Sequence, residues 1–320
     1  MEDGPDKSRA ENFGAPLLVG TQNSDGGWGF HPSAGSRVEP TCWVLKALTA
    51  LESPNGLIGQ AVNRGLNFLI AAQLPDGSWP STPEMKTGCW VTSLACWVLR
   101  DAHSEKYQIA IGNGLRWICR DWPKDSSPWR RRLRSFSRKN QHFKFADGAR
   151  GWGWTPRTSS WVEPTALALL ALEGQQDSVL PSSAQKRRKL GEALLYDRMC
   201  VGGGWNCGNP WVYGVPDDPL VVPTSWALLA LRAHPEQRES LDSLAWLERS
   251  FGDIKAPGSL ALATICLESY GRERPGNASL SEYDVENEST RNTQVAAWRA
   301  LAVSDTRRWL SARAGAEVHD

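Results

Sequence analysis

The sequence predicts an all-α fold, an (α/α)6 toroid in which six inner and six outer helices form a double ring. Two observations predict it: a glycine–tryptophan turn that recurs along the chain, and helical segments of two alternating kinds. The turns contain Trp28, Trp79, Trp152 and Trp205, and each precedes an apolar helical segment. Self-similarity of this kind is typical of a repeat architecture in which every copy supplies one structural unit.

The first kind of segment carries a single apolar stripe. In the segment 59–73, Val62, Leu66, Leu69 and Ile70 fall on one helical face. Such helices cover a core with one face and meet solvent with the other, so we assign them to the outer ring. The predicted outer helices are 12–22, 59–73, 106–120, 185–199, 238–250 and 304–313.

The second kind is rich in alanine and leucine and apolar on nearly every face, which predicts burial on every face. Pro40, Pro164, Pro223 and Pro257 lie at or near the starts of these segments, where a missing backbone N–H costs little. Clean alternation of polar and apolar residues extends over no more than a few positions, so a sheet is not expected. The predicted inner helices are 41–52, 91–101, 164–173, 223–233, 258–270 and 292–302.

The chain of 320 residues is 41% hydrophobic, enough for a large core. We expect one toroid domain over 1–320, with the regular spacing broken by a basic insertion at 121–151, a loop at about 200–222 and an irregular loop at 271–291. Long connections of this kind are functional or disordered, and we expect the first and third to be partly mobile.

Composition narrows the functional classes. No stretch approaches the roughly 20 apolar residues of a spanning helix, and the acidic start lacks the plan of a secretory signal. The seven scattered cysteines are typical of reduced thiols in a cytoplasmic protein. A net charge of +1 argues against a dedicated nucleic-acid binder.

Residues 64–79 read Arg-Gly-x-x-Phe-Leu-x-x-x-Gln-x-x-x-Gly-x-Trp, and 14–28 form a slightly degenerate copy. This pattern resembles the QW repeat of squalene and oxidosqualene cyclases. The inner-helix phrase Pro-Thr followed by small and apolar residues is similar to these cyclases and to the β subunits of protein prenyltransferases. The resemblance covers nearly the whole chain and implies a toroid with an aromatic-lined cavity for isoprenoids. The chain has room for one such domain, whereas squalene cyclases carry two.

The repeat itself is interpreted as structural. A glutamine amide can bond backbone groups at a helix end while the tryptophan packs over it, which ties one outer helix to the next. Gln22, Trp28, Gln73 and Trp79 are therefore expected to be fold residues.

The resemblance also implies where catalytic groups belong. Squalene cyclases carry an Asp-x-Asp-Asp-Thr run whose middle Asp is the acid, and crowded carboxylates keep one proton bound. Aligning Thr165 places Glu163 at that middle position, without the flanking Asp; Glu39 holds the same place before Thr41. The cysteine and histidine that bind zinc in prenyltransferases are missing at the comparable positions, so neither a metal nor a cofactor is expected.

Two interpretations of Glu39 and Glu163 remain open. A carboxylate in the first turn of a helix interacts favourably with the positive end of the helix dipole, and repetition of the phrase favours this role. Alternatively Glu163 is an acid that faces the cavity, with Trp152, Trp154 and Trp161 as apolar surroundings that bind substrate and raise its pKa.

The loop 202–219 departs most from the repeat and leads into an inner helix. It is either part of a ligand site or an elaborate turn with a solvated Asp pair. Asp217 and Asp218 are alternative candidates for the acid, although adjacent residues on an extended backbone point opposite ways. The candidate substrate-binding residues of this loop are Trp205, Asn206, Cys207, Trp211 and Tyr213.

The run 129–139 is strongly basic. It is interpreted as a solvated insertion, or as a contact for anionic lipid headgroups or a diphosphate, which arginine grips in bidentate fashion. Peripheral membrane association of a cytoplasmic protein therefore stays open.

Three functional hypotheses follow. The first is an atypical terpene cyclase or isomerase-like enzyme that uses Glu163, Asp217 or Asp218 as the acid on a hydrophobic isoprenoid. The second is a non-catalytic toroid that binds a lipid or a protein. The third is a carbohydrate-active toroid with paired carboxylates, against which the QW resemblance counts.

Overall fold

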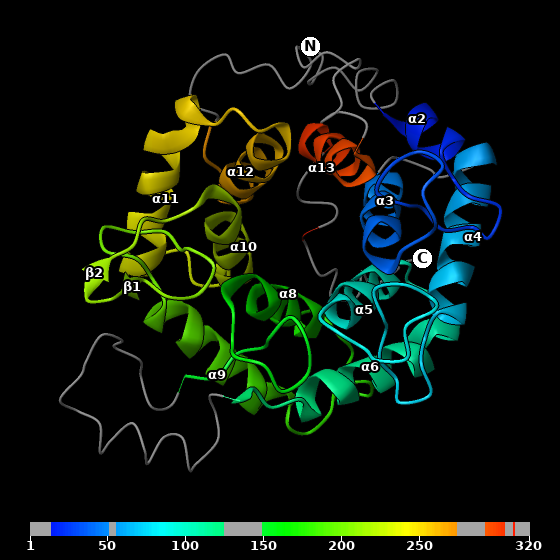
Figure 1. The fold of residues 1–320 in the computed structure, drawn as a ribbon, viewed down its shortest axis with the longest axis horizontal. Coiled ribbons are helices and arrows are strands. Elements are labelled where there is room, and N and C mark those ends of the chain that lie inside the picture. The colour runs from blue at the N-terminus through cyan, green and yellow to red at the C-terminus, as the bar shows by residue number, and fades with distance from the viewer. Residues whose placement is uncertain (1–13, 51–55, 125–148, 274–291, 305–309, 311–320) are drawn as a thin grey trace, which may run out of the picture.

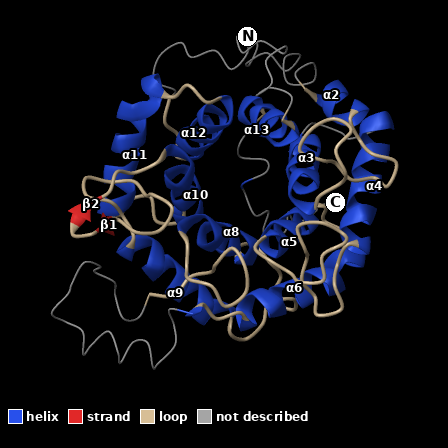
Figure 2. Cartoon of the chain, viewed as in Figure 1, coloured by secondary structure: helices blue, strands red, loops and turns tan. Residues whose placement is uncertain are grey.

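The computed structural model describes residues 14–50, 56–124, 149–273, 292–304 and 310. This part of the chain is mostly helical (Figure 2), which confirms the predicted all-α class. Strand structure in it is confined to a short antiparallel hairpin, β1 (Trp211–Val212) and β2 (Val215–Pro216), which the sequence pattern did not predict. Two 3-10 turns, η1 (Glu105–Tyr107) and η3 (Phe251–Asp253), adjoin helices.

Six of the described helices line the inside of the ring in Figure 1. Each packs against the next in a closed cycle, α3 to α5, α8, α10, α12, α13 and back to α3. Their apolar sequences explain this position, since nearly every residue of α8 and α12 is buried. The inner helices are α3 (Val38–Ala50), α5 (Val91–Asp101), α8 (Val162–Leu172), α10 (Val221–Leu231), α12 (Pro257–Ser269) and α13 (Thr293–Val303).

The amphipathic helices pack on the outside of this cycle. Helix α4 contacts α3, α6 contacts α5, α9 contacts α8 and α11 contacts α10. Their bounds, with the short first helix, are α2 (Ala15–Gly20), α4 (Gly56–Ala71), α6 (Gln108–Arg120), α9 (Ala184–Asp197) and α11 (Arg238–Ser250). The predicted outer helix 304–313 lies almost wholly outside the described residues, as do most of the basic insertion and of the loop 271–291.

The four glycine–tryptophan turns are built alike. In each, the backbone N–H of the tryptophan donates to the buried hydroxyl of a threonine in the inner helix that follows, at 2.8–3.0 Å. The indole N–H of Trp79 donates to the carbonyl of Leu69 at the end of the preceding outer helix, at 2.6 Å. Trp28, Trp152 and Trp205 make the corresponding bond to Leu18, Ile118 and Leu195. Each tryptophan therefore joins one outer helix to one inner helix.

The two glutamines link consecutive outer helices. The amide of Gln22 donates to the carbonyls of Gly26 and Ala61, and that of Gln73 to those of Gly77 and Ala110. These bonds confirm the backbone-bonding role expected from the sequence.

Other side chains serve the later turns, which lack the glutamine. Arg187, fully buried on α9, reaches back to the carbonyl of Gly151 at 3.2 Å and lies over the ring of Trp152 at 4.0 Å. In the fourth turn Ser243 of α11 accepts from the N–H of Gly204 at 2.8 Å. The link between neighbouring outer helices is thus kept by a residue of the following helix.

A second set of bonds joins the inner helices around the ring. In each bond the acceptor is the backbone carbonyl of the residue two positions after a turn tryptophan. The donor is a backbone N–H at the start of the inner helix that comes just before, in the ring, the inner helix following that turn. Ser81, Trp154, Cys207 and Phe30 accept from Val38, Trp90, Val162 and Thr293, respectively. Helices α13, α3, α5, α8 and α10 therefore begin at the same face, here called the N-terminal face of the ring.

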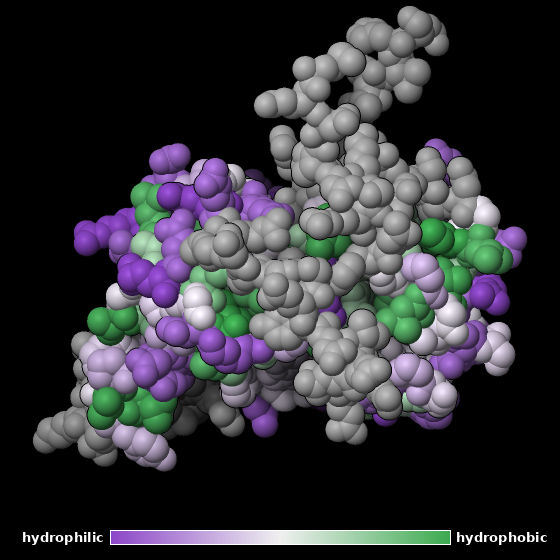
Figure 3. Space-filling model, turned by 90° about the horizontal axis from the view of Figure 1, so that it is seen from above, coloured by the Kyte–Doolittle hydropathy of each residue, from purple (hydrophilic) through white to green (hydrophobic). Residues whose placement is uncertain are grey.

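The surface of the described part mixes polar and apolar residues. In the view of Figure 3, hydrophobic residues form small groups between hydrophilic ones. Leu57, Ile109 and Tyr213 are among the most exposed large apolar side chains. None of the described helices combines the length and apolarity needed to cross a membrane.

Candidate functional site

Three polar side chains stand at one level on the N-terminal face. Glu39, Glu163 and Gln294 are each the second residue of their helices, α3, α8 and α13. Gln294 donates a side-chain hydrogen bond to the carboxylate of Glu39. Both glutamates are half-buried. The ring thus brings together two carboxyl groups that lie more than a hundred residues apart in the sequence.

One helical turn deeper, the lumen becomes aromatic. Trp43, Trp226 and Trp298 each stand five residues after the first residue of α3, α10 and α13, and Leu167 holds this place in α8. Four residues of helix correspond to about 6 Å of rise, which is the separation between the acidic level and this aromatic level.

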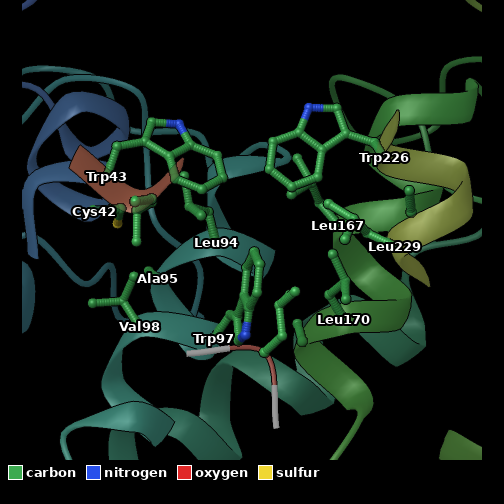
Figure 4. Packing of buried hydrophobic residues seen from close by; sticks show 14 of the residues in the cluster. Cys42, Trp43, Leu94, Ala95, Trp97, Val98, Leu167, Leu170, Trp226 and Leu229 are labelled. Carbon is green, nitrogen blue, oxygen red and sulfur yellow. The ribbon is translucent and has the colours of Figure 1, made fainter. Parts of the chain in front are cut away.

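The tryptophans meet across the ring. Helices α3 and α10 lie opposite each other in the cycle of inner helices, yet the rings of Trp43 and Trp226 are stacked with centroids 5.2 Å apart. Trp298 contacts both edge-on, at 5.6 and 6.1 Å, and Trp97 of α5 does so at 6.2 and 6.5 Å. Figure 4 shows Trp43, Trp97 and Trp226 turned toward one another, with Leu167 and Leu170 beside them. We call Trp43, Trp97, Trp226 and Trp298 the tryptophan cluster.

Burial changes the acidity of both carboxyl groups. It raises the pKa of Glu163 from 4.5 to about 7. The pKa of Glu39 also rises to about 7, chiefly through burial, while the hydrogen bond from Gln294 opposes the rise and the charge of Glu163 adds to it. Near neutral pH the pair therefore retains protons that exposed carboxyl groups would have lost.

These pKa values predict a pH-dependent stability. Between about pH 4.5 and 7 the folded state holds protons that the unfolded chain releases, so stability falls as pH rises through this window. Glu163→Gln removes one titrating group. We expect the difference in unfolding free energy between about pH 5 and 8 to shrink by about 1–3 kcal/mol, measured from urea midpoints. Glu236→Gln, at an exposed site, should leave it unchanged. A variant at position 163 with the wild-type pH profile would contradict this assignment.

Charged residues gather near the opposite end of the ring, where the inner helices have their C-termini. Lys46 of α3 is fully buried, forms an ion pair with Asp101 of α5 and lies 3.8 Å from the centroid of the Trp97 ring. Arg100 donates to carbonyls of Leu170 and Glu173 at the end of α8. Cations near carbonyls at helix C-termini offset the negative end of the helix dipole, so we assign these groups a structural role.

Arg232, just after α10, completes this group. It pairs with the carboxylate of Glu173 at 2.7 Å and donates to the carbonyl of Leu310 at 2.6 Å. Leu310 itself is buried in the core. The lumen therefore has carboxyl groups at one end, tryptophans in the middle and paired charges at the other end.

Some of the predicted substrate-binding residues lie near Glu163. Trp161 immediately precedes α8 and is 38% exposed, and Trp154 packs edge-on against Trp90 at 5.3 Å. The carbonyl of Cys207 accepts from Val162, and the charge of Glu163 helps raise the pKa of the exposed Cys207 thiol, after burial. Trp161, Trp154 and Cys207 thus belong to loops that border the N-terminal face.

Other predicted residues are held within the fold. Trp152 and Trp205 are buried and make the turn bonds described above. Asn206 organises its own loop: its carbonyl oxygen accepts from the N–H groups of Gly208 and Asn209, and its amide donates to Asp217 at 2.9 Å.

The rest of that loop points away from the lumen. Trp211 and Tyr213 belong to the β1–β2 hairpin, which Figure 1 places at the outer edge of the ring, and Tyr213 is 81% exposed. Asp217 and Asp218 follow the hairpin and are exposed.

Sequence reasoning did not single out several residues of the lumen. Trp43, Trp226 and Trp298 sit inside apolar segments, and Gln294 lies in the polar start of the segment that contains Trp298. The three tryptophans share one position relative to the starts of their helices, and this shared position could have identified them from the sequence. Within the described ranges no three His, Cys, Asp or Glu side chains gather as metal ligands would, and the basic run 129–139 lies outside them.

Comparison with known proteins gives local matches. No family model matches the chain. Lanosterol synthase from Mus musculus is 38% identical over 74 residues, 20% of this chain and 10% of that protein. Drimenyl diphosphate synthase from Streptantibioticus cattleyicolor is 40% identical over 67 residues, 21% of this chain and 12% of that protein. Each match spans only about a tenth of the relative, and together they support a place in a terpene cyclase-like superfamily.

Solved structures extend the likeness to the whole fold. A protein from Actinoplanes is 16% identical with a TM-score of 0.59, and the alignment covers 96% of this chain and 100% of that one. A glycosidase variant is 10% identical with a TM-score of 0.57 and the same coverage of both chains. Identities this low show the fold alone, and one fold serves unrelated chemistries. Function must be argued from the site.

Proposed function

We propose that the chain is a single-domain (α/α)6 toroid of the terpene cyclase kind, which binds an isoprenoid-type substrate in its ring and cyclises it with Glu163 as an atypical acid. The observation that carries the proposal is the position of Glu163: a half-buried carboxyl group with a pKa of about 7, one helical turn from an aromatic layer. The local likeness to two cyclases supports the choice of substrate class.

The chemistry needs few groups. The carboxyl O–H of Glu163 gives its proton to one carbon of an alkene, whose π electrons form the new C–H bond and leave a carbocation on the other carbon. A neighbouring alkene attacks that cation to close a ring. The final cation loses a proton to water as a C=C bond forms, and the Glu163 carboxylate regains a proton from solvent. A proton donor works best with a pKa near the working pH, and faces of tryptophan stabilise positive charge.

The geometry ranks the candidate residues. Glu163 is half-buried at the start of the inner helix α8, whereas Asp217 and Asp218 are exposed beyond a hairpin at the outer edge of the ring. Among the predicted substrate-binding residues, we propose Trp154, Trp161 and Cys207 for the border of the site, because their loops join the N-terminal face.

The proposal is tested by ligand capture followed by turnover. Native mass spectrometry after incubation with a cell lipid extract should reveal a retained apolar ligand. Turnover of that ligand should fall about 10²–10⁴-fold in Glu163→Gln, and wild-type activity should decline as pH rises above about 7 because the acid form is lost. Glu84→Gln, at a fully exposed site, is the matched control. Absence of a retained ligand, or full activity in Glu163→Gln, would refute the enzyme.

A non-catalytic lipid-binding toroid is the second candidate. The contacts among Trp43, Trp226 and Trp298 favour it, because they occupy the lumen that a cyclase would use for its substrate. It predicts a retained ligand that is recovered chemically unchanged from wild type and Glu163→Gln alike.

A further inference from the structure

The tryptophan cluster reaches across the lumen, with Trp43, Trp226 and Trp298 at one level. Its members come from α3, α5, α10 and α13, and the stacked pair Trp43 and Trp226 bridges opposite sides of the ring. Trp43 and Trp226 are only 1% and 2% exposed, so the two rings leave little of their surface open. A ligand that enters from the N-terminal face therefore meets an aromatic floor.

The space above this floor is shallow. The second residues of α3, α8 and α13 form the acidic level, and the floor begins at Trp43 and Trp298, four residues later in α3 and α13, which is about 6 Å along the helix axis. An extended isoprene unit is about that long. Below the floor, toward the C-terminal ends of the inner helices, Asp101 pairs with Lys46 and Arg100, and Arg100 also donates to the carbonyl of Glu173.

We propose that the tryptophan cluster sets the chain length that the site recognises, so that the ring takes up the terminal isoprene unit of a prenyl chain and leaves the rest outside. This inference rests on the proposed isoprenoid site and adds the part of the substrate that is bound. Trp43 and Trp226 are its specificity-determining residues, because their contact alone closes the lumen between opposite helices.

The physical consequence is a plateau in affinity. Each methylene that moves from water into an apolar site adds binding free energy, whereas one that stays in water adds none. For the wild type, affinity should be level from geraniol through farnesol and geranylgeraniol to squalene, because about one isoprene unit fits above the floor. Removing the floor should let further units enter, so that affinity rises with chain length.

The test compares the dissociation constants of these four compounds, measured by native mass spectrometry, in wild type and Trp43→Ala/Trp226→Ala. We expect the double variant to bind geranylgeraniol at least roughly tenfold more tightly than the wild type does, with a smaller gain for geraniol. Trp246→Ala removes a half-buried tryptophan of the outer helix α11 and should keep the wild-type plateau.

Folding is controlled with a milder change. If the double variant does not give a cooperative thermal transition by circular dichroism, Trp226→Leu alone should show the same shift at reduced size. A wild-type affinity that climbs steadily through squalene, or variants with an unchanged plateau, would overturn the inference while the isoprenoid site stands. Failure of every compound to bind every variant would overturn both the inference and the proposed function.

Discussion

Replacing Trp79 with alanine is expected to destabilise the protein by about 3–5 kcal/mol, the range for removing a large buried aromatic side chain. Trp79 is fully buried, and its indole N–H donates to Leu69 at 2.6 Å. Its backbone N–H meets Thr92 at 2.9 Å. The substitution empties the space between α4, α5 and α6 and leaves a helix-end carbonyl without its donor. Urea denaturation followed by circular dichroism measures the loss.

Two further variants separate the causes. Trp79→Phe retains most of the apolar area but not the donor, so its loss should be smaller than that of the alanine variant. Trp161→Ala removes an indole that is 38% exposed and should cost no more than about 1 kcal/mol. Equal losses at positions 79 and 161 would contradict the structural role assigned to the turn tryptophans.

The same turn explains why the helices were predictable. Helical periodicity and the position of each turn are local properties, and the predicted segment 91–101 coincides with α5 (Val91–Asp101). The closing bonds could be anticipated in kind from Gln22 and Gln73. Arg187 could not, because it acts on a turn whose tryptophan lies 35 positions earlier, a partnership that only the packed ring creates.

The candidate site was predictable in part. Glu163 was found because a recurring phrase fixes its place relative to Thr165. The aromatic layer was missed because an inner helix is apolar on every side, so its sequence does not reveal which side faces the lumen. That choice is made by the curvature of the ring, which brings Trp43 and Trp226 together from opposite helices.

The β1–β2 hairpin marks another limit. Two-residue strands give no alternation to detect, and the sharp turn depends on Tyr213 and Gly214, both at positive φ. Because the hairpin projects at the outer edge, it carries Trp211 and Tyr213 away from the lumen. The composition of the loop 202–219 made it a candidate for a ligand site. Composition does not reveal that the hairpin projects outward from the ring.

Asp101→Ala is expected to cost about 3–5 kcal/mol at neutral pH, the range for removing one partner of a buried ion pair. The ammonium group of Lys46 is fully buried and pairs with Asp101, whose side chain is 17% exposed. Burial already lowers the pKa of Lys46 from 10.5 to about 8, and Asp101 opposes that fall. Without Asp101 the charged lysine keeps its desolvation cost and loses its main compensation.

The pH dependence gives the prediction its sign. Between about pH 8 and 10.5 the unfolded chain binds the lysine proton and the folded one does not, so stability rises with pH. Loss of Asp101 lowers the folded pKa further and extends this rise to lower pH. The gap between wild type and Asp101→Ala should therefore narrow as pH rises from about 7 to 9, measured from urea midpoints, because Lys46 becomes neutral in both.

Two controls make this conclusion specific to burial. Lys46→Met/Asp101→Leu replaces the pair with apolar side chains and should recover most of the lost stability. Asp242→Ala breaks the ion pair with Arg238. The side chain of Asp242 is 47% exposed and that of Arg238 is 90% exposed, so the loss should change stability by no more than about 0.5 kcal/mol. If Asp101→Ala and Asp242→Ala lose equally little stability, Asp101 does not stabilise the buried charge of Lys46. If the double variant stays as unstable as Asp101→Ala, the loss of stability arises from the bonds that Asp101 makes with Arg100.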